Sequence, residues 1–487
     1  MKRTTSILLA GVVLTCMASA PAWGKSAKRG VGENQFSLAY EMDVLKPGVT
    51  WYYNWGNTPA KGYEGQVETY DGMDFVPMCW NANYNADKIR EYVKAHPECR
   101  YLLGFNEPNF TAQANMTPEV AAGHWTAVQA LAKELNLKLV APALNYSPNA
   151  PYQDPCKWMD EFVALVGPDA FDYTAIHVYG GYGVLTDLAT KFHDKYGKDV
   201  WVTEFCYWPE AGNQNSSVTP STQINFMTQA LEWLETTPWI HKYAWFKAKG
   251  GYNSNKGPNY GLIIPQSGYD ERRLSPQGMV YCYMSDFDRE VWNAVGTEFP
   301  AVDYVASNAI ELYPGNDAGC AKPIEISRFN SGSTVDWQFD VPEAGRYDLK
   351  LIVTGMGEPT RFDPKLRVQL VNGDEVTDLT DVVGMTLPNS EEKYEARTIN
   401  VTLPSGHVTL RLADAAPYQP SGIRISRVGL YAEGSGAVEG VAMETLTKVN
   451  VYNMQGVMLK RNVEPADAID GLAPGLYIIG NRKVLIK

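Results

Sequence analysis

Between residues 28 and 290, short apolar runs typical of strands alternate with helical stretches. The runs predict eight strands, at residues 28–31, 49–55, 74–80, 101–107, 138–144, 173–179, 200–207 and 242–247. The clearest helix is predicted at 117–135, where Thr117 suits an N-cap, Pro118 the first turn and Glu119 an early acidic position. Eight strand–crossover units in a row predict an α/β fold with a (β/α)8 TIM-like barrel over 28–290. Some connections are short, which indicates reduced outer helices.

The pattern changes near residue 296 to strands of alternating polarity, separated by Gly, Pro, Asn and Asp turns. These alternating strands predict a β-sandwich over 296–432, with strands at 333–341, 347–353, 367–371, 398–403, 408–412 and 423–431. After a Gly-Ser-Gly step at 434–436, the segment 437–487 contains short apolar runs such as 475–479. This segment is predicted to form a small β-rich C-terminal domain.

The first residues have the charged, apolar and small-residue order of a secretory signal peptide. Cleavage is predicted close to Ala22, so that residues 1–22 are removed and the protein is secreted or held at the cell surface. A lipoprotein interpretation through Cys16 is weaker, because the two residues before it are not the small ones usual beside a lipidated cysteine. No later run is long and apolar enough to predict a membrane span.

The formal net charge of −13 argues against nucleic-acid and polyanionic partners and is compatible with a neutral polysaccharide. The chain is 12% aromatic, with 13 Trp and 29 Tyr, which fits either sugar stacking or a large core. The histidines are scattered without an HExxH pattern, and the Gly180–183 string lacks the setting of a nucleotide site, so no metal and no cofactor are expected. Of the cysteines outside the signal, Cys79 and Cys99 are the first pair to test for a disulfide.

Two apolar runs each end in a glutamate, Glu107 and Glu204. A (β/α)8 barrel carries its chemistry at the C-terminal ends of its strands, so both side chains are expected on one face. A glycosidic bond is cut by one carboxyl group that protonates the leaving oxygen and a second that attacks or stabilises the sugar carbon. Either glutamate alone could simply pair with a cation in a loop. The two together at strand ends predict a catalytic pair.

Other strand ends supply candidate substrate-binding residues. Asn106 is predicted to bond a sugar hydroxyl, with a turn role beside proline as the alternative. His177 and Tyr179 alternate on one strand and share a side; Tyr179 is predicted to position Glu204, and His177 either binds sugar or is a satisfied core histidine. Asn54 is a further hydroxyl partner. Of four tryptophans, two are expected to stack on substrate and the other two to belong to the core: Trp55, Trp80, Trp208 and Trp245. Trp245 is the first choice for stacking, because it ends the last strand.

The strings Trp51-Tyr52-Tyr53-Asn54-Trp55-Gly56, Gly104-Phe105-Asn106-Glu107-Pro108-Asn109, Ile176-His177-Val178-Tyr179 and Trp201-Val202-Thr203-Glu204 resemble glycoside hydrolase family 128 over roughly 28–285. The resemblance implies a retaining β-1,3-glucanase with Glu107 as acid/base and Glu204 as nucleophile. The middle domain resembles, more weakly, galactose-binding-like sandwiches such as family 6 and 35 carbohydrate-binding modules. It departs from the commonest of these modules in its few tryptophans, Trp337 being the only one over 296–432. The tail is similar to sorting domains of bacterial type IX secretion.

These observations predict a secreted, monomeric, retaining endo-β-1,3-glucanase whose partner is the polysaccharide and whose tail engages the cell surface or secretion machinery. A different class of protein remains open, a non-catalytic surface glycan-binding protein that keeps the barrel as a platform. Within enzymes, another β-glucan or mannan is an alternative substrate. A further possibility is that the sandwich, by gripping polysaccharide, decides where the protein acts.

Overall fold

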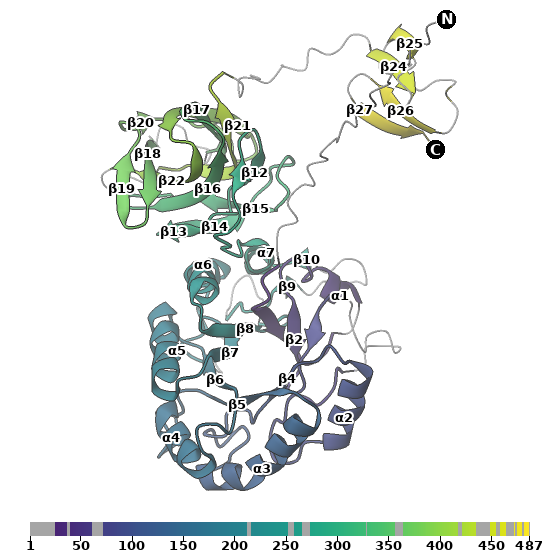
Figure 1. Cartoon of the computed structure of the whole chain (residues 1–487), viewed down its shortest axis with the longest axis vertical. Coiled ribbons are helices and arrows are strands. Elements are labelled where there is room, and N and C mark those ends of the chain that lie inside the picture. The colour runs from purple at the N-terminus through teal and green to yellow at the C-terminus, as the bar shows by residue number, and fades with distance from the viewer. Residues whose placement is uncertain are drawn as a thin grey trace, which may run out of the picture.

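The structure is a computed structural model that describes residues 25–36, 39–60, 72–211, 216–251, 258–264, 273–327, 329–355, 364–416, 421–434, 449–453, 458–463, 472, 475–479 and 482–486. Eight parallel strands line one barrel (Figure 1): β1 Arg29–Gly32, β2 Trp51–Tyr53, β3 Asp74–Phe75, β4 Tyr101–Leu103, β5 Lys138–Leu144, β6 Tyr173–Val178, β7 Val200–Phe205 and β8 Ile240–Phe246. The order β3-β2-β1-β8-β7-β6-β5-β4 closes through a parallel bridge between Met78 and Leu103. The predicted barrel is confirmed, although β3 and β4 are shorter than the strands predicted at 74–80 and 101–107.

Helices surround the barrel as crossovers: α1 Ala39–Asp43, α2 Ala86–Ala95, α3 Pro118–Glu134, α4 Pro155–Val166, α5 Tyr182–Tyr196, α6 Pro220–Thr236 and α7 Pro276–Tyr283. The N-cap of α3 is Thr117, whose hydroxyl accepts from the Val120 N–H, as its sequence predicted. The helix α1 has only five residues, and the described residues between β2 and β3 contain no helix. The expected reduction of the outer layer therefore falls at the start of the barrel.

Side chains fill the barrel in layers. The inner cluster contains Trp51, Tyr53, Val76, Met78, Leu103, Val140, Ala143, Ala175, Trp201 and Ala244. Gly30 makes room for this packing, because a Cβ there would lie 2.2 Å from Cε2 of Trp51. Alternate strand residues face outward into a second core beneath the helices. The inner layers fill the barrel below its C-terminal face, so a bound molecule can enter only at the C-terminal mouth.

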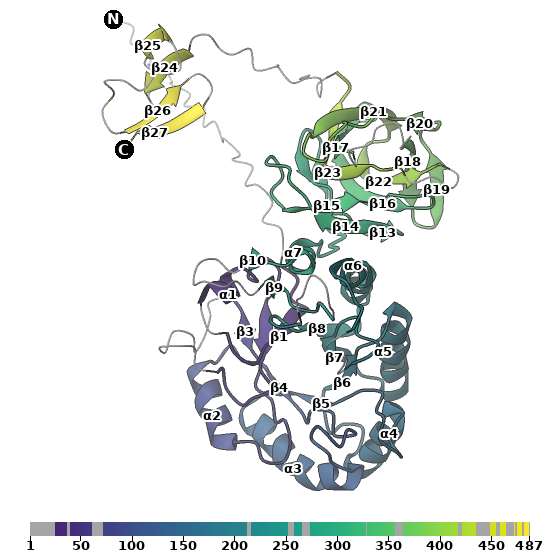
Figure 2. The same cartoon turned by 180° about the vertical axis from the view of Figure 1, so that it is seen from behind.

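The C-terminal half folds as two packed, mostly antiparallel sheets (Figure 2). One sheet joins β11 Asn293–Ala294, β13 Ala306–Asn308, β16 Thr334–Val341, β18 Lys365–Asn372, β19 Glu375–Asp378, β20 Val383–Gly384 and β22 Gly406–Asp414. The other joins β12 Glu298–Pro300, β14 Glu311–Pro314, β15 Ile324–Ser327, β17 Gly345–Thr354, β21 Glu395–Leu403 and β23 Arg424–Ala432. Trp337 is fully buried and donates its indole N–H to the Ala301 carbonyl, so it is a core residue of the sandwich.

The sandwich packs against the barrel through α6, α7 and β14. The carboxylate of Glu232 on α6 accepts hydrogen bonds from the backbone N–H and the hydroxyl of Ser307, and the Tyr313 hydroxyl lies 2.8 Å from that of Ser221. A small hairpin, β9 Ile263–Ile264 with β10 Arg273–Leu274, precedes α7. These contacts hold the sandwich beside the barrel wall.

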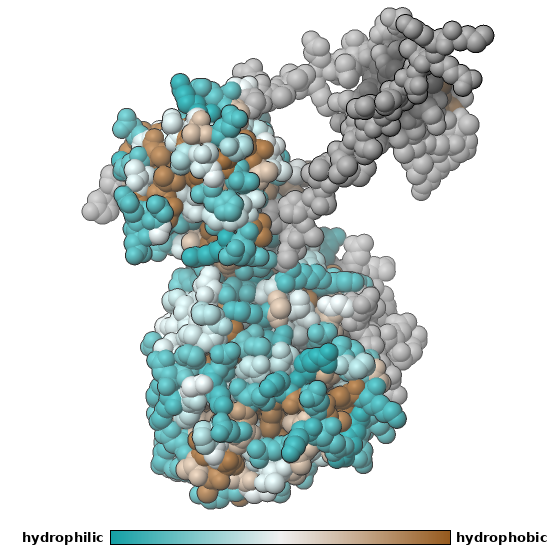
Figure 3. Space-filling view, viewed as in Figure 1, coloured by the Kyte–Doolittle hydropathy of each residue, from teal (hydrophilic) through white to brown (hydrophobic). Residues whose placement is uncertain are grey.

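The described part of the tail forms one four-stranded antiparallel sheet, from β24 Val449–Asn453, β25 Met458–Val463, β26 Gly475–Ile479 and β27 Arg482–Ile486. The predicted signal segment 1–22 lies outside the described residues. Within the described residues, no helix has both the length and the apolar character needed to cross a bilayer. The face of barrel and sandwich shown in Figure 3 is largely hydrophilic with scattered apolar patches.

Cys79 and Cys99 are free thiols, so the disulfide considered for them is not formed in the structure. Both side chains are buried in the outer core, where each packs as a small apolar residue. Burial raises the pKa of the Cys99 thiol to about 11 and raises that of Cys79 further. Both thiols therefore stay protonated and unreactive at neutral pH.

Arg29 at the start of β1 ties the barrel to α6 and to the end of α7. Its guanidinium donates to Glu235 Oε1 at 3.0 Å, to the Tyr281 carbonyl at 2.9 Å and to the Ser285 carbonyl at 2.7 Å, and its side chain is 2% exposed. Arg29→Met leaves the Glu235 carboxylate buried without its cation, so we expect a loss of about 3–5 kcal/mol in the free energy of unfolding. Thermal and denaturant unfolding measure this loss. The exposed Arg90→Met control, at an ion pair with Glu134, should change stability much less.

Candidate active site

Glu107 and Glu204 meet at the C-terminal face of the barrel. Glu107 follows β4. Its backbone N–H donates to the Ala143 carbonyl on β5, which fixes its position beside that strand. Glu204 lies near the end of β7. The two residues are 6% and 5% exposed. One carboxylate oxygen of each lies within 4.8 Å of the other and of a His177 nitrogen. Two acids nearly a hundred residues apart thus form one buried cluster.

A β-bulge aims Glu204 into the barrel. The pairing of β7 with β6 runs from Ile176 opposite Val202 to His177 opposite Glu204, which places one extra residue on β7. Simple alternation from the inward-facing Trp201 would have turned Glu204 outward. The extra residue reverses the alternation at this point, as bulges beside active sites often do. The irregular strand is therefore what makes Glu204 available for chemistry.

Three donor groups surround the Glu204 carboxylate. The indole N–H of Trp55 donates to Oε1 at 2.7 Å. The Tyr53 hydroxyl lies 3.2 Å from the same oxygen and 3.0 Å from the Thr203 carbonyl, so these two acceptors share its one proton. The Tyr179 hydroxyl donates to Oε2 in a short hydrogen bond. Burial raises the pKa of both tyrosines well above 10, so they remain donors. Donors on both oxygens favour the ionised carboxylate and fix its orientation.

Glu107 has a different set of neighbours. His177 Nδ1 lies 3.0 Å from Glu107 Oε1, and the Asn145 side-chain amide donates to the same oxygen at 3.4 Å. The backbone of Glu107 has φ +40°, in the left-handed region that a glutamate rarely adopts. Trp55 is held in the same region with φ +61°. Strained backbone at two residues of one cluster is typical of a functional site rather than of a packing solution.

His177 links the two acids. It is fully buried, and its Nδ1 also lies 3.5 Å from Glu204 Oε2. Burial by itself lowers the pKa of His177, but the negative charge of Glu204 and the hydrogen bond and charge of Glu107 outweigh it, so the pKa is raised. The pKa of Glu204 is raised by burial, against the lowering effect of His177, while the charge of Glu107 adds to the increase. The pKa values of His177 and Glu204 therefore depend on each other's charge.

A groove of about 1090 Å3 opens over the cluster and contains five of the predicted substrate-binding residues: Trp55, Trp80, Asn106, Tyr179 and Trp208. His177 lies beneath its floor, against both glutamates. The Oδ1 atom of Asn106 is buried, and no described residue donates to it. An unfilled acceptor beside Glu107 suits a sugar hydroxyl, which is the kind of contact predicted for Asn106.

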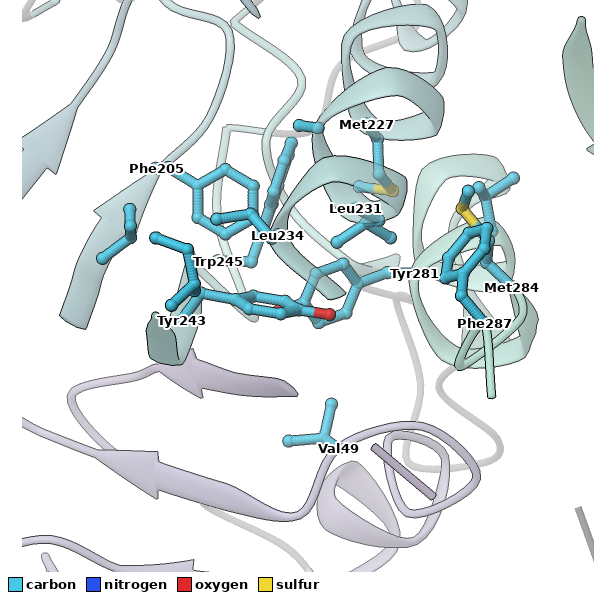
Figure 4. Packing of buried hydrophobic residues seen from close by; sticks show 14 of the residues in the cluster. Val49, Phe205, Met227, Leu231, Leu234, Tyr243, Trp245, Tyr281, Met284 and Phe287 are labelled. Atoms are coloured by element: carbon cyan, nitrogen blue, oxygen red, sulfur yellow. The ribbon is translucent and has the colours of Figure 1, made fainter. Parts of the chain in front are cut away.

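Trp245 does not reach the groove, which corrects its choice as the first stacking platform. It is fully buried, and its indole N–H donates to the Tyr260 carbonyl. Figure 4 shows Trp245 in the outer core with Phe205, Leu234 and Tyr281. Strand alternation explains the error: Ala244 faces the barrel interior, so Trp245 faces the helices and Phe246 reaches the groove.

Asn54 also lies outside the groove. Its side-chain amide donates to the Thr58 carbonyl, and its Oδ1 accepts from the Gly56 N–H, so both ends of the amide are used within its own loop. This is the local side-chain hydrogen bonding for which asparagine is favoured in turns. The structure therefore places Asn54 outside the groove and uses its side chain within its own loop.

Sequence reasoning gave no role to three residues that complete the site: Tyr53, Asn145 and Phe246. Strand alternation could have predicted that each of them faces inward. Tyr53 lies two residues after Trp51 and two before Trp55, and Phe246 lies two after Ala244. Asn145 lies two after Ala143, which faces the barrel interior. Once one inward residue is known, the next in register follows.

The atoms of Glu107, His177 and Glu204 also have spacing that could hold a metal ion. The hydrogen bonds argue for another use of the same atoms. Both oxygens of Glu204 already accept from Trp55, Tyr53 and Tyr179, and these donors are what an ionised carboxylate needs when no cation is bound to it. We therefore interpret the cluster as an acid pair.

A TIM-like barrel with two buried, converging carboxylates at its C-terminal face defines a glycoside hydrolase. Comparison with known proteins agrees: residues 30–281 match the family described as "Glycosyl hydrolase catalytic core". The match spans more than half of the chain, and the protein belongs to this family.

Several known proteins are similar to the barrel. A family 128 (subgroup II) endo-β-1,3-glucanase from Pseudomonas viridiflava is 32% identical, with 53% of this chain and 98% of that chain covered and a TM-score of 0.46. One from Sorangium cellulosum is 34% identical, covering 52% and 97% with a TM-score of 0.44. Alkali-sensitive linkage protein 1 of Schizosaccharomyces pombe is 26% identical over 238 residues; the match covers 48% of this chain and 41% of that protein, so the chain spans less than half of this curated relative.

Proposed function

We propose that the protein is a secreted, retaining endo-β-1,3-glucanase in which Glu204 is the nucleophile and Glu107 the acid/base. The carrying observation is the separation of the two acids, with one oxygen of each within 4.8 Å. Retaining enzymes hold their carboxyl groups about 5–5.5 Å apart, whereas inverting enzymes need about 6.5–9.5 Å to admit a water molecule. The short separation favours direct attack by one carboxylate.

The hydrogen bonds distribute the two roles. Glu204, surrounded by three donor groups, is suited to be the anion that attacks the anomeric carbon. Glu107 then protonates the leaving oxygen, the glycosidic C–O bond breaks, and the sugar becomes an ester of Glu204. In the second step water gives a proton to Glu107 as it attacks the same carbon and releases Glu204. Because His177 contacts both acids, it can balance the charge as the proton moves.

The substrate assignment rests on the barrel's likeness to the two endo-β-1,3-glucanases at 32% and 34% identity. A groove of about 1090 Å3 exceeds the space of one glucosyl ring and suits several, which supports endo action. Trp55, Trp80 and Trp208 offer indole surfaces along it. Export through the signal segment and attachment or secretion through the tail belong to the same proposal. The sandwich is proposed as a spacer, because Trp337 is buried in its core and Trp292, at its start, stacks on His407 of β22.

The test is product release from linear β-1,3-glucan by the purified mature protein. The proposal expects short oligosaccharides of mixed length from the first minutes, and proton NMR should show the new reducing ends initially in the β configuration. Release of glucose alone would indicate exo action, and initial α-anomers would contradict the retaining mechanism. No release from β-1,3-glucan, with release from another β-glucan or mannan, would overturn the substrate.

The pH profile should depend on Tyr179. Its hydrogen bond lowers the pKa of Glu204 and so opposes the increase caused by burial. In Tyr179→Phe the carboxylate loses this donor and its pKa rises, so the nucleophile becomes ionised only at higher pH. We expect the acid limb of kcat/KM to move to higher pH and the plateau to fall by about tenfold or more. An acid limb at the wild-type position would show that Tyr179 does not act through Glu204.

A further inference from the structure

A second cavity, of about 190 Å3, lies where the barrel meets the sandwich. It opens at the start of β1, on the side of the barrel opposite the catalytic mouth. The end of α7 forms one wall, and α7 lies between the barrel and the sandwich (Figure 1). Gly48 lets the loop before β2 approach this helix, because a Cβ there would lie 2.3 Å from the Cys282 carbonyl oxygen. The sandwich contributes Asp303 and Lys322.

Asp303 brings to this cavity an acceptor atom that no described residue fills. Its side chain is 7% exposed, and its Oδ1 accepts from the Lys322 ammonium. Its Oδ2 is buried, and the described residues give it no donor. Burial raises the pKa of Asp303 to about 6 against the lowering effect of Lys322, and the charge of Asp286 adds to the increase. A buried carboxylate oxygen beside a second acid favours a cationic donor.

The other cations that line the cavity do not supply this donor. The pKa of Lys25 is lowered by burial and by the charge of Lys46, which is the opposite of what a carboxylate partner causes. The Arg29 guanidinium is engaged by Glu235 and by backbone carbonyls. A donor for Asp303 Oδ2 therefore has to come from outside the described residues.

The chain enters the barrel beside this cavity. Lys25 and Ser26 line it, and the Ser26 hydroxyl donates to Glu235 Oε2 at 2.7 Å, which fixes the segment before β1 against α6. Cleavage after Ala22 makes Trp23 the first residue of the mature chain, two residues before Lys25. Because one residue spans at most about 3.6 Å, the α-amino nitrogen of Trp23 lies within about 7 Å of the backbone nitrogen of Lys25. Removal of the signal segment thus creates a cationic group next to the cavity.

We propose that the α-ammonium group of the mature chain binds in this cavity against Asp303 Oδ2, so that removal of the signal segment completes the junction between barrel and sandwich. The inference rests on the export that belongs to the proposed function and not on the chemistry of the acid pair. Before cleavage the same nitrogen belongs to a neutral peptide bond and cannot supply the charge. Since Asp303 belongs to the sandwich and Trp23 leads into β1, the ion pair joins the two domains directly.

The experiment uses the full chain exported from a bacterial host, and its intact mass gives the first residue. An aldehyde reagent selective for α-amines is added at pH 7, and mass spectrometry of the N-terminal peptide gives the labelling rate, with a Trp-Gly-Lys tripeptide as the exposed reference. The variants are Asp303→Asn, which keeps an acceptor for Lys322, and Asp288→Asn, the matched control at an exposed aspartate after α7. A further chain carries four residues inserted between Ala22 and Trp23.

We expect the wild-type amine to react about tenfold or more slowly than the tripeptide, because an ammonium held against a carboxylate stays protonated and only the neutral amine reacts. Asp303→Asn should bring the rate to that of the tripeptide, whereas Asp288→Asn should leave it slow. The extended chain should react as fast as the tripeptide and unfold at a lower temperature than wild type.

A wild-type amine that reacts as fast as the tripeptide overturns the inference, as does a slow rate that Asp303→Asn leaves unchanged or a first residue other than Trp23. The extended chain keeps Asp303, so it tests the inference even if Asp303→Asn is unstable: unfolding at the wild-type temperature overturns it. Glucan hydrolysis by the same samples is a separate readout. Hydrolysis with a fast-reacting amine leaves the proposed catalytic function in place, and a protected amine without hydrolysis overturns that function alone.

Discussion

Glu204→Gln is expected to lose glucanase activity by about four orders of magnitude or more, the usual scale for removing a group that forms the covalent intermediate. The amide has the shape of the carboxylate, so Trp55 and Tyr53 can still donate to its oxygen and the barrel should fold unchanged. What is lost is the anion that attacks the anomeric carbon. Reducing-sugar release from linear β-1,3-glucan measures the loss.

Two measurements make the result specific to Glu204. Thermal unfolding of the variant should match wild type, which separates a chemical defect from a structural one. Glu91→Gln, at an exposed acid on α2, is the charge-matched control and should keep full activity. Activity of Glu204→Gln within about tenfold of wild type would remove the nucleophile from Glu204. Binding of glucan by an inactive wild type would instead favour the glycan-binding alternative.

The pairing of Glu107 with Glu204 could be predicted from the sequence because each ends a recognisable apolar run. Eight strands in sequence predict a barrel, and a barrel brings strand ends to one face regardless of their separation in the chain. His177 and Tyr179 were placed together for a similar reason, since residues two apart on a strand share a side. The structure agrees, with both side chains directed at the acids.

The errors have a physical cause in strand register. A strand pattern shows which residues alternate but not which set faces inward, and Trp245 was assigned to the wrong set. The extra residue on β7 could not be predicted, because a bulge appears only when the register of β7 against its neighbours is known. Without this extra residue, alternation from Trp201 predicts that Glu204 points outward. The position of Glu204 at a strand end therefore indicated its role better than the alternation of inward and outward residues did.

The roles of the hydrogen-bond donors were equally out of reach. Tyr53 on β2 and Trp55 just after it reach Glu204 on β7 from across the barrel, because β1 and β8 lie between β2 and β7 in the order of the sheet. Their contact depends on the diameter of the closed barrel and on the left-handed backbone of Trp55. Neither quantity has a local signature in the sequence. The sequence likewise could not show that Asn54, beside Trp55, bonds within its own loop instead of lining the groove.

The effect of Glu107→Ala on activity should depend on the leaving group of the substrate, which distinguishes the role of Glu107 from that of Glu204. On β-1,3-glucan, whose leaving sugar oxygen needs a proton, we expect a loss of about 10²–10⁴-fold. A β-glucoside oligomer with a dinitrophenyl leaving group needs no proton, so Glu204 should still form its ester, which then accumulates because no base activates water. A burst of dinitrophenol followed by slow turnover is the expected trace.

Azide then decides which acid has which role. Azide needs no base, and in Glu107→Ala it can enter the space left by the side chain and attack the ester of Glu204 from the face of the departed group. The product should be the β-glycosyl azide, with dinitrophenol release restored. If Glu107 were the nucleophile, its removal would leave azide to attack the substrate directly, and the product would be the α-azide. The anomer of one product therefore tests the assignment that the donors around Glu204 support: the carboxylate with three donor groups attacks, and the carboxyl group beside His177 and Asn145 moves the proton.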